Sequence, residues 1–273
     1  MVNRIFIAST EKGSGKSLVT IGLMSALQGI VPRVGYMKPV GQRYESVNGI
    51  EADAALVKSI FDLPDDPRDI SPMSLVQAQL DKDALFERIF ESFKAISENK
   101  DVVFIEGTDY TSTMSALEFD INAELAQNLV APVLLVALGH EKSIDDIVHN
   151  VTEYAESFRE NGCTMLGAVV NRFDSQNPQK DALKLRERLE RKGLPLFGVI
   201  LNNPVLSGPR LSEVSDALSA EIVIRGDNLD RVVTETKILA MTPENALEFI
   251  SDQDGYLLIT SGDRAEHIFT ILA

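Results

Sequence analysis

The stretch "IASTEKGSGKS" (Ile7–Ser17) decides the fold. It follows the apolar run "RIFIA" (Arg4–Ala8), which is typical of a strand buried on both faces. It precedes "SLVTIGLMSAL" (residues 17–27), where apolar side chains recur at helical spacing. A buried strand, a glycine-rich turn with Lys-Ser and a helix, in this order, are the context of a phosphate-binding P-loop. The sequence therefore predicts a phosphate site directly after the first strand.

The residue types of this loop suit phosphate binding. Gly13 and Gly15 permit left-handed backbone and close approach of N–H groups to phosphate oxygens. Lys16 brings positive charge toward the β- and γ-phosphates, and the Ser17 hydroxyl can bind Mg²⁺. The general pattern G-x-x-x-x-G-K-[ST] has glycine where this chain has Thr10, which is distant enough from the lysine for the loop to work. The expected nucleotide contacts are Thr10, Glu11, Lys12, Gly13, Ser14, Gly15, Lys16 and Ser17.

Composition and charge limit the classes of partner. The 273 residues are 44% hydrophobic and 25% charged, which is ordinary for a globular protein. Asp and Glu outnumber Lys and Arg by 41 to 26, giving a net charge of −15. Such a surface repels polyphosphate backbones and anionic lipids, so we expect neither nucleic acid nor membrane as a partner. One cysteine, Cys163, together with the lack of a leader or long apolar run, favours the cytoplasm.

Short apolar runs alternate with segments of helical periodicity, which favours an α/β fold with a doubly wound, mostly parallel sheet. A stretch rich in Asn, Pro and Gly (Asn202–Arg210) marks a connection to a smaller α/β unit. We therefore expect a nucleotide-binding domain at residues 1–204 and a small domain at 205–273. The expected strands are 4–8, 34–37, 102–106, 132–138, 166–171 and 196–200. The expected helices include 81–99, 145–160 and 178–192.

A family resemblance rests on the loop. The pattern T-[DE]-x-x-x-G-K-[ST] is matched by Thr10, Glu11, Gly15, Lys16 and Ser17. In this respect the chain resembles the dethiobiotin synthetase branch of P-loop proteins, which includes the nucleotide domain of cobyrinic acid a,c-diamide synthase. It is most similar to the dethiobiotin-synthetase-like domain at the N-terminus of some phosphotransacetylases, where a domain called DRTGG follows. The resemblance covers residues 2–204 and, more weakly, 205–273 through "AMTPENALEFI" and "LLITSGDR". It implies ATP and Mg²⁺ as cofactors and a homodimer.

Four further residues complete the expected site. Glu106 ends an apolar strand, where carboxylates of parallel sheets face the ligand crevice. The resemblance places Lys38 of "GYMKPVGQR" near the γ-phosphate, as a catalytic partner of Lys16. It implies Ser17, Asp53 and Glu106 as Mg²⁺ ligands, although Asp53 also suits a helix N-cap. It also implies that Asn171 pairs with the adenine edge.

Two interpretations of function remain open. True dethiobiotin synthetases have E-G-A-G-G where this chain has "EGTDY" (Glu106–Tyr110), and their G-x-I-P turn is "GVIL" (Gly198–Leu201) here. These departures and the added small domain favour an ATP-binding regulatory module. The alternative is an ATP-dependent ligase that activates a small carboxylate substrate, so enzyme activity is left open. Of the histidines, His140 alone is expected to follow a strand near the site.

Overall fold

The computed structural model describes residues 3–42, 50–80, 82–109, 115–249 and 255–272. The chain forms two compact units, unit 1 (Met1–Asn202) and unit 2 (Asn203–Ala273).

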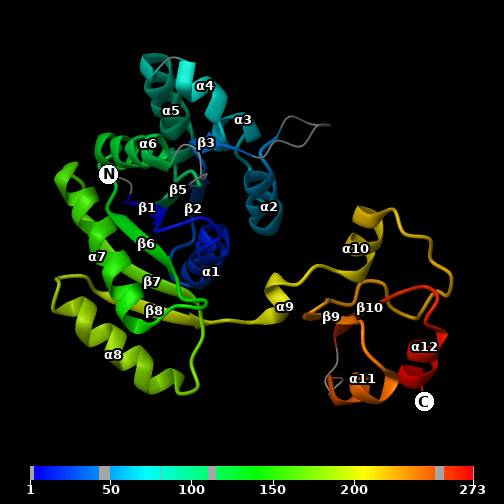
Figure 1. Cartoon of the computed structure of the whole chain (residues 1–273). Helices are drawn as coiled ribbons and strands as arrows, with labels where there is room; N and C mark the ends of the chain where they lie inside the picture. Colours follow the sequence, from blue (N-terminus) through cyan, green and yellow to red (C-terminus); the bar gives the residue numbers. More distant parts are fainter. Residues whose placement is uncertain (1–2, 43–49, 81, 110–114, 250–254, 273) are drawn as a thin grey trace. The chain divides into compact units, whose positions relative to one another are not determined.

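A six-stranded sheet forms the centre of unit 1, with strand order β2-β5-β1-β6-β7-β8. All neighbouring strands pair in parallel, which confirms the predicted fold class (Figure 1). The central strands are apolar on both faces because helices cover both sides of such a sheet. The strands are β1 (Asn3–Ser9), β2 (Val34–Met37), β5 (Val102–Glu106), β6 (Val133–Leu138), β7 (Met165–Phe173) and β8 (Leu196–Leu201).

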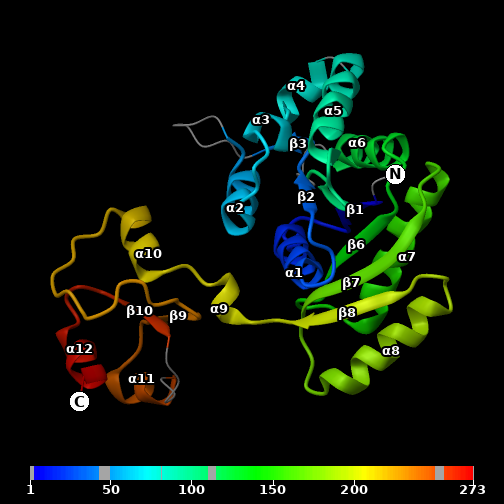
Figure 2. The same cartoon turned by 180° about the vertical axis from the view of Figure 1, so that it is seen from behind.

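The helices of unit 1 pack on two sides of this sheet. In Figures 1 and 2, α7 and α8 lie together on one side and α1 lies on the other. This follows from right-handed crossovers that run from β1 toward β2 in one direction and from β6 toward β8 in the other. The longer helices are α1 (Lys16–Gln28), α2 (Ala52–Phe61), α5 (Lys82–Ser97), α6 (Ser115–Asn128), α7 (Ile144–Glu160) and α8 (Pro178–Glu190).

Short elements occupy the segment between β2 and α5. Strand β3 (Val40–Gly41) pairs in parallel with β4 (Met73–Ser74). The short helices α3 (Pro67–Ile70) and α4 (Leu75–Leu80) flank β4. The sequence has no long apolar run here, so periodicity gives little indication of these elements.

The reversal of strand order fixes the place of the site. Chain connections diverge from β1, toward β2 and β5 on one side and toward β6, β7 and β8 on the other. Ligands of open parallel sheets bind at the carboxyl ends of the strands, where connections diverge in this way. The loop after β1 lies at this point.

Unit 2 contains a two-stranded parallel sheet of β9 (Glu235–Leu239) and β10 (Tyr256–Thr260). The segment 220–224 ("AEIVI") forms no strand, although it is rich in β-branched residues, and Val223 and Ile224 are exposed. The helices of this unit are α9 (Pro204–Ser207), α10 (Leu211–Leu218), α11 (Pro243–Phe249) and α12 (Ala265–Leu272).

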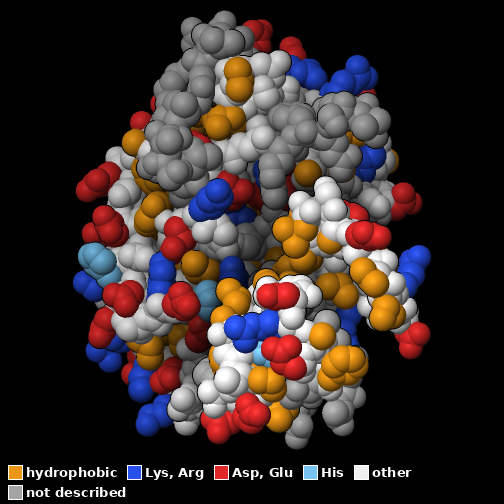
Figure 3. All heavy atoms as spheres, turned by 45° about the vertical axis from the view of Figure 1, so that its right-hand side comes forward, with side chains coloured by type: hydrophobic (Ala, Val, Ile, Leu, Met, Phe, Trp, Pro, Cys, Tyr) orange, Lys and Arg blue, Asp and Glu red, His pale blue; other side chains and the backbone are white. Residues whose placement is uncertain are grey.

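Within the described residues, no helix is both long and apolar enough to cross a bilayer. Acidic side chains are spread over the face shown in Figure 3, among basic ones, in keeping with the net charge of −15.

Candidate functional site

The backbone of the β1–α1 loop has the conformation that phosphate binding requires. Gly13 (φ 76°) and Gly15 (φ 82°) are both left-handed. Gly15 precedes α1, and no side chain caps the first turn of that helix. A Cβ atom on Gly15 would lie 2.4 Å from Nδ2 of Asn171, so this position lacks room for a side chain. The start of α1 therefore offers backbone N–H groups and the positive end of a helix dipole.

Thr10, which replaces the first glycine of the general pattern, continues the sheet. Its N–H donates to the carbonyl of Val136 at 3.2 Å, so residue 10 extends the pairing of β1 with β6. The hydroxyls of Thr10 and Ser14 in the loop, and of Thr108 after β5, are buried without a hydrogen-bond partner. Buried hydroxyls normally have partners, so these three favour a polar ligand here.

Lys16 is buried at the start of α1 and bonds to groups from β1 and from the loop after β5. Its Nζ donates to Oγ of Ser9 at 3.2 Å and forms an ion pair with the carboxylate of Asp109. The Lys16 side chain is 2% exposed and that of Asp109 is 33% exposed. Burial raises the pKa of Asp109, but the Lys16 charge and hydrogen bond outweigh this and lower it overall. Asp109 is therefore an ionised counter-charge.

Glu106 at the end of β5 is held from both sides. Ser17 donates its hydroxyl to Oε1 at 2.7 Å, and Tyr36 of β2 donates its hydroxyl to Oε2 at 3.0 Å. Burial, and after it the charge of Glu106, raises the pKa of Tyr36 well above its ordinary value. The tyrosine thus remains a hydrogen-bond donor that orients the carboxylate.

Lys38 lies directly after β2, enclosed by three carboxylates. Its Nζ forms an ion pair with Asp53 and lies 3.4 Å from Oε1 of both Glu51 and Glu106. Burial alone would lower the pKa of Lys38, but the three carboxylates raise it above its ordinary value. Lys38 is therefore an ammonium ion in an excess of negative charge.

Glu51 is a member of this cluster that no sequence motif indicated. Its Oε2 accepts from the N–H of Ala54, so Glu51, rather than Asp53, is the N-cap of α2. Its Oε1 is buried without a hydrogen bond. Burial raises the pKa of Glu51, and the Lys38 charge opposes this only in part.

The predicted Mg²⁺ ligands lie together around this cluster. Ser17 contacts Glu106 directly, and Lys38 bridges Glu106 to Asp53. Among the described residues, no group of three or more His, Cys, Asp or Glu side chains is arranged to hold a metal ion. Mg²⁺ in phosphate sites needs only one or two protein oxygens besides phosphate and water. The hydroxyl–carboxylate pair of Ser17 and Glu106 fits this requirement, and the ligand assignment stays a prediction.

Asn171 of β7 is tied to the loop. It is 1% exposed, and its Nδ2 donates to the carbonyl of Ser14 at 2.8 Å. Its predicted contact with adenine stays a prediction. Of the other predicted loop contacts, Glu11 is paired with Lys142 and Lys12 is exposed.

A cavity of about 480 Å³ opens at the carboxyl ends of β7 and β8. His140 lies at its border, where its Nδ1 is 2.7 Å from Oδ2 of Asp174. Asn202 donates to Oδ1 of the same carboxylate at 3.0 Å. The lining residues are Phe173, Asp174, Ser175, Gln176, Leu201 and Asn202.

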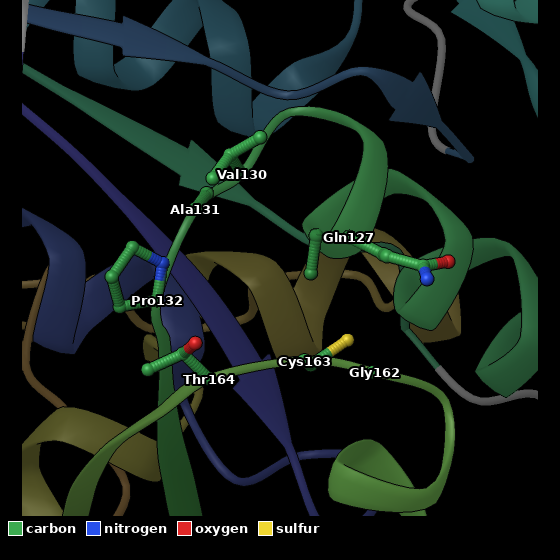
Figure 4. A pocket seen from close by; sticks show the side chains of 8 residues that line it. Gln127, Val130, Ala131, Pro132, Gly162, Cys163 and Thr164 are labelled. Atoms are coloured by element: carbon green, nitrogen blue, oxygen red, sulfur yellow. The ribbon is translucent and has the colours of Figure 1, made fainter.

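Cys163 lies elsewhere. It precedes β7 and, with Gln127, Val130 and Pro132, lines a small cavity of about 120 Å³ (Figure 4). This cavity lies at the amino ends of the parallel strands β6 and β7, whereas the P-loop follows the carboxyl end of β1. Burial raises the pKa of its thiol. A buried thiol with a raised pKa is a weak nucleophile.

Comparisons with known proteins agree with this architecture. The AAA domain family matches residues 3–220. The chain belongs to this AAA domain family. A DRTGG domain matches residues 213–273, which confirms the predicted pairing of a P-loop domain with a DRTGG domain.

The curated relatives include two phosphate acetyltransferases. That of Nitratidesulfovibrio vulgaris is 30% identical over 280 residues, and that of Synechocystis sp. is 27% identical over 278 residues. Each alignment covers 100% of this chain and 39% of the relative, so the chain spans about two-fifths of their length. Among solved structures, the MinD cell division protein of Aquifex aeolicus is similar with a TM-score of 0.46 and 15% identity, over 76% of this chain and 85% of that chain.

Proposed function

We propose that this AAA-domain protein binds ATP with Mg²⁺ through unit 1 and acts as a nucleotide-sensing regulatory module. One observation carries the proposal: a loop with left-handed Gly13 and Gly15 precedes an uncapped helix whose first residue is the buried Lys16. Backbone N–H groups, a helix N-terminus and an ammonium converge there, and together they favour a polyphosphate.

The metal side of the site follows from the oxygen donors present. Mg²⁺ bound there would supply positive charge that offsets the charge of the phosphate oxygens. Ser17 and Glu106 would hold it, and Asp53 stands behind Lys38 as the third predicted ligand. Tyr36 keeps Glu106 oriented through its hydroxyl, so the carboxylate does not have to reorganise on binding.

The base of the nucleotide would lie beyond β6, toward the ends of β7 and β8. Asn171 borders the P-loop on that side, and an amide can pair with the donor and acceptor on an adenine edge. The cavity between Phe173 and Leu201 offers apolar surface for a flat ring. This arrangement supports a purine nucleoside triphosphate, with ATP as the expected one.

The regulatory role is inferred from the pairing of the two domains and from the relatives in which they occur. Two curated relatives that align with the whole of this chain are phosphate acetyltransferases, and the aligned region is about two-fifths of their length. A P-loop domain followed by a DRTGG domain suits a module whose nucleotide state shifts a conformational equilibrium. We propose that it does so as a homodimer.

A ligase is the second candidate, because a second lysine lies beside the P-loop. Lys38 contacts Glu106, which contacts Ser17, so a second ammonium is close to the place of the γ-phosphate. An ATP-dependent ligase would use it to hold a small carboxylate substrate during phosphoryl transfer. ADP formation that depends strictly on an added carboxylate or amine would favour the ligase over the module.

Isothermal titration with ATP and millimolar Mg²⁺ tests the proposal. We expect saturable binding, and we expect Lys16→Ala to weaken it at least about 100-fold, since charge-assisted hydrogen bonds are worth ~1.5–3 kcal/mol each. Lys94→Ala, an exposed position on α5, is the matched control and should bind as the wild type does. Absence of ATP binding by the wild-type protein would reject both the module and the ligase.

A further inference from the structure

Lys16 is already paired within the protein itself. Its ammonium is paired with Asp109 and bonded to Ser9, and its side chain is 2% exposed. An ammonium buried to this degree requires a counter-charge. In the ligand-free protein Asp109 supplies that charge, at the nitrogen that a P-loop lysine offers to the β- and γ-phosphates.

Asp109 and a phosphate therefore compete for one cation. If both anions stayed beside Lys16, two like charges would share a nearly buried site, which is costly at a low local dielectric constant. Lys16 keeps Asp109 ionised in the ligand-free protein, so an incoming phosphate meets a charged carboxylate. The repulsion between the two anions is relieved when the carboxylate turns away from Lys16.

The structure gives Asp109 a way to leave. Its side chain is 33% exposed, whereas its main chain is fixed by a hydrogen bond of 2.8 Å from Nε2 of Gln42 to its carbonyl. The carboxylate can turn toward solvent while the backbone stays in place. The carboxylates around Lys38 have no such route to solvent. Glu51 is 0% exposed, Glu106 is 1% exposed and Asp53 is 8% exposed. A nucleotide can thus take Lys16 from its partner more readily than it can take Lys38.

We infer that Asp109 is an affinity- and specificity-determining residue that acts as an internal competitor of phosphate at Lys16. The inference rests on the proposed function and adds which ligands the site accepts. A ligand must present a phosphate able to displace a carboxylate from Lys16. A free carboxylate substrate would meet a position that the protein's own carboxylate already fills. The site therefore selects nucleoside di- and triphosphates over carboxylate ligands.

Titration of full-length Asp109→Asn with ATP and Mg²⁺ tests the inference. We expect ATP to bind this variant at least about tenfold more tightly than it binds the wild type, because the competing charge is gone while the shape of the side chain is kept. Asp101→Asn is the matched control: it removes an ion-paired carboxylate (with Arg33) just before the opposite end of β5, and it should leave ATP affinity unchanged.

Folding is followed separately, since Lys16 loses its partner in Asp109→Asn. Each protein is compared with its own nucleotide-free form, and we expect ATP to raise the Tm of the variant more than that of the wild type. Equal or weaker ATP affinity of Asp109→Asn, beside measurable binding by the wild type, would overturn this inference and leave the proposed function standing. If neither protein binds ATP, both are overturned.

Discussion

The glycines of the loop show how single residues set the site. Gly15 combines a left-handed backbone with a 2.4 Å approach of its absent Cβ to Asn171, so two independent reasons require glycine there. From the sequence alone, phosphate binding was the only reason found for glycine at this position. The crowding by Asn171 depends on β7, which lies more than 150 residues further along the chain, so no local pattern could show it.

Two alanine substitutions test whether glycine is required at position 15. We expect Gly15→Ala to lower the free energy of unfolding by at least ~1–2 kcal/mol, the cost of a left-handed alanine, and to abolish ATP binding by displacing Asn171. Gly22→Ala within α1 is the control: its added Cβ meets nothing within 4 Å, and alanine there should stabilise by about 0.5–1 kcal/mol. Chemical denaturation of both variants measures the difference. Equal stability of the two would show that Gly15 is unstrained.

The charged residues were predictable to different degrees. Lys16, Ser17 and Glu106 follow from the P-loop pattern and from the rule that carboxyl ends of parallel strands share one edge. Asp109 was visible only as part of "EGTDY", where the family has glycines, and its pairing with Lys16 required the structure. Tyr110 of that stretch lies outside the described residues. No sequence motif assigns a role to Glu51 or Tyr36, because their roles arise from burial beside other charges.

At the scale of elements, the long buried strands were the most predictable part. Strands β5, β6 and β7 each contain a run of apolar residues because helices cover both faces of a parallel sheet. The elements between β2 and α5 were not predicted, because strands of two residues and helices of four to six carry too little periodicity. The start of α2 illustrates the limit: Asp53 suited an N-cap by sequence, and Glu51 takes that role.

The cap of α2 gives a prediction on pH. The pKa of Glu51 is raised in the folded protein, so its proton stabilises the fold at low pH and this contribution is lost as the pH rises through the folded pKa. Glu51→Gln keeps a side-chain oxygen for the N–H of Ala54 but cannot ionise. We therefore expect the variant to gain Tm relative to the wild type as the pH rises from the ordinary carboxyl pKa toward the raised one. A Tm difference that does not change with pH would contradict this account.

At the scale of the whole molecule, the sequence and the comparisons agree on a P-loop domain joined to a DRTGG domain. The net charge of −15 disfavours nucleic acids and anionic lipids as partners. It does not prevent a small anionic ligand from binding at the local positive charge of Lys16. The domain boundary at residue 204, the homodimer, the cytoplasmic location and the Mg²⁺ ligands stay predictions. The proposed regulatory role requires that nucleotide binding change the conformation or binding of a second site, distinct from the P-loop.

The central claim is that the loop from Thr10 to Ser17 encloses the phosphates of a nucleotide. A crystal structure of the protein soaked with Mg²⁺ and a non-hydrolysable ATP analogue tests it most directly. The account predicts β- and γ-phosphate oxygens on the backbone N–H groups of residues 13–17 and on Nζ of Lys16, with the Asp109 carboxylate turned away. Phosphates bound elsewhere, or a saturated crystal in which Lys16 still holds Asp109 and the loop is empty, would contradict it.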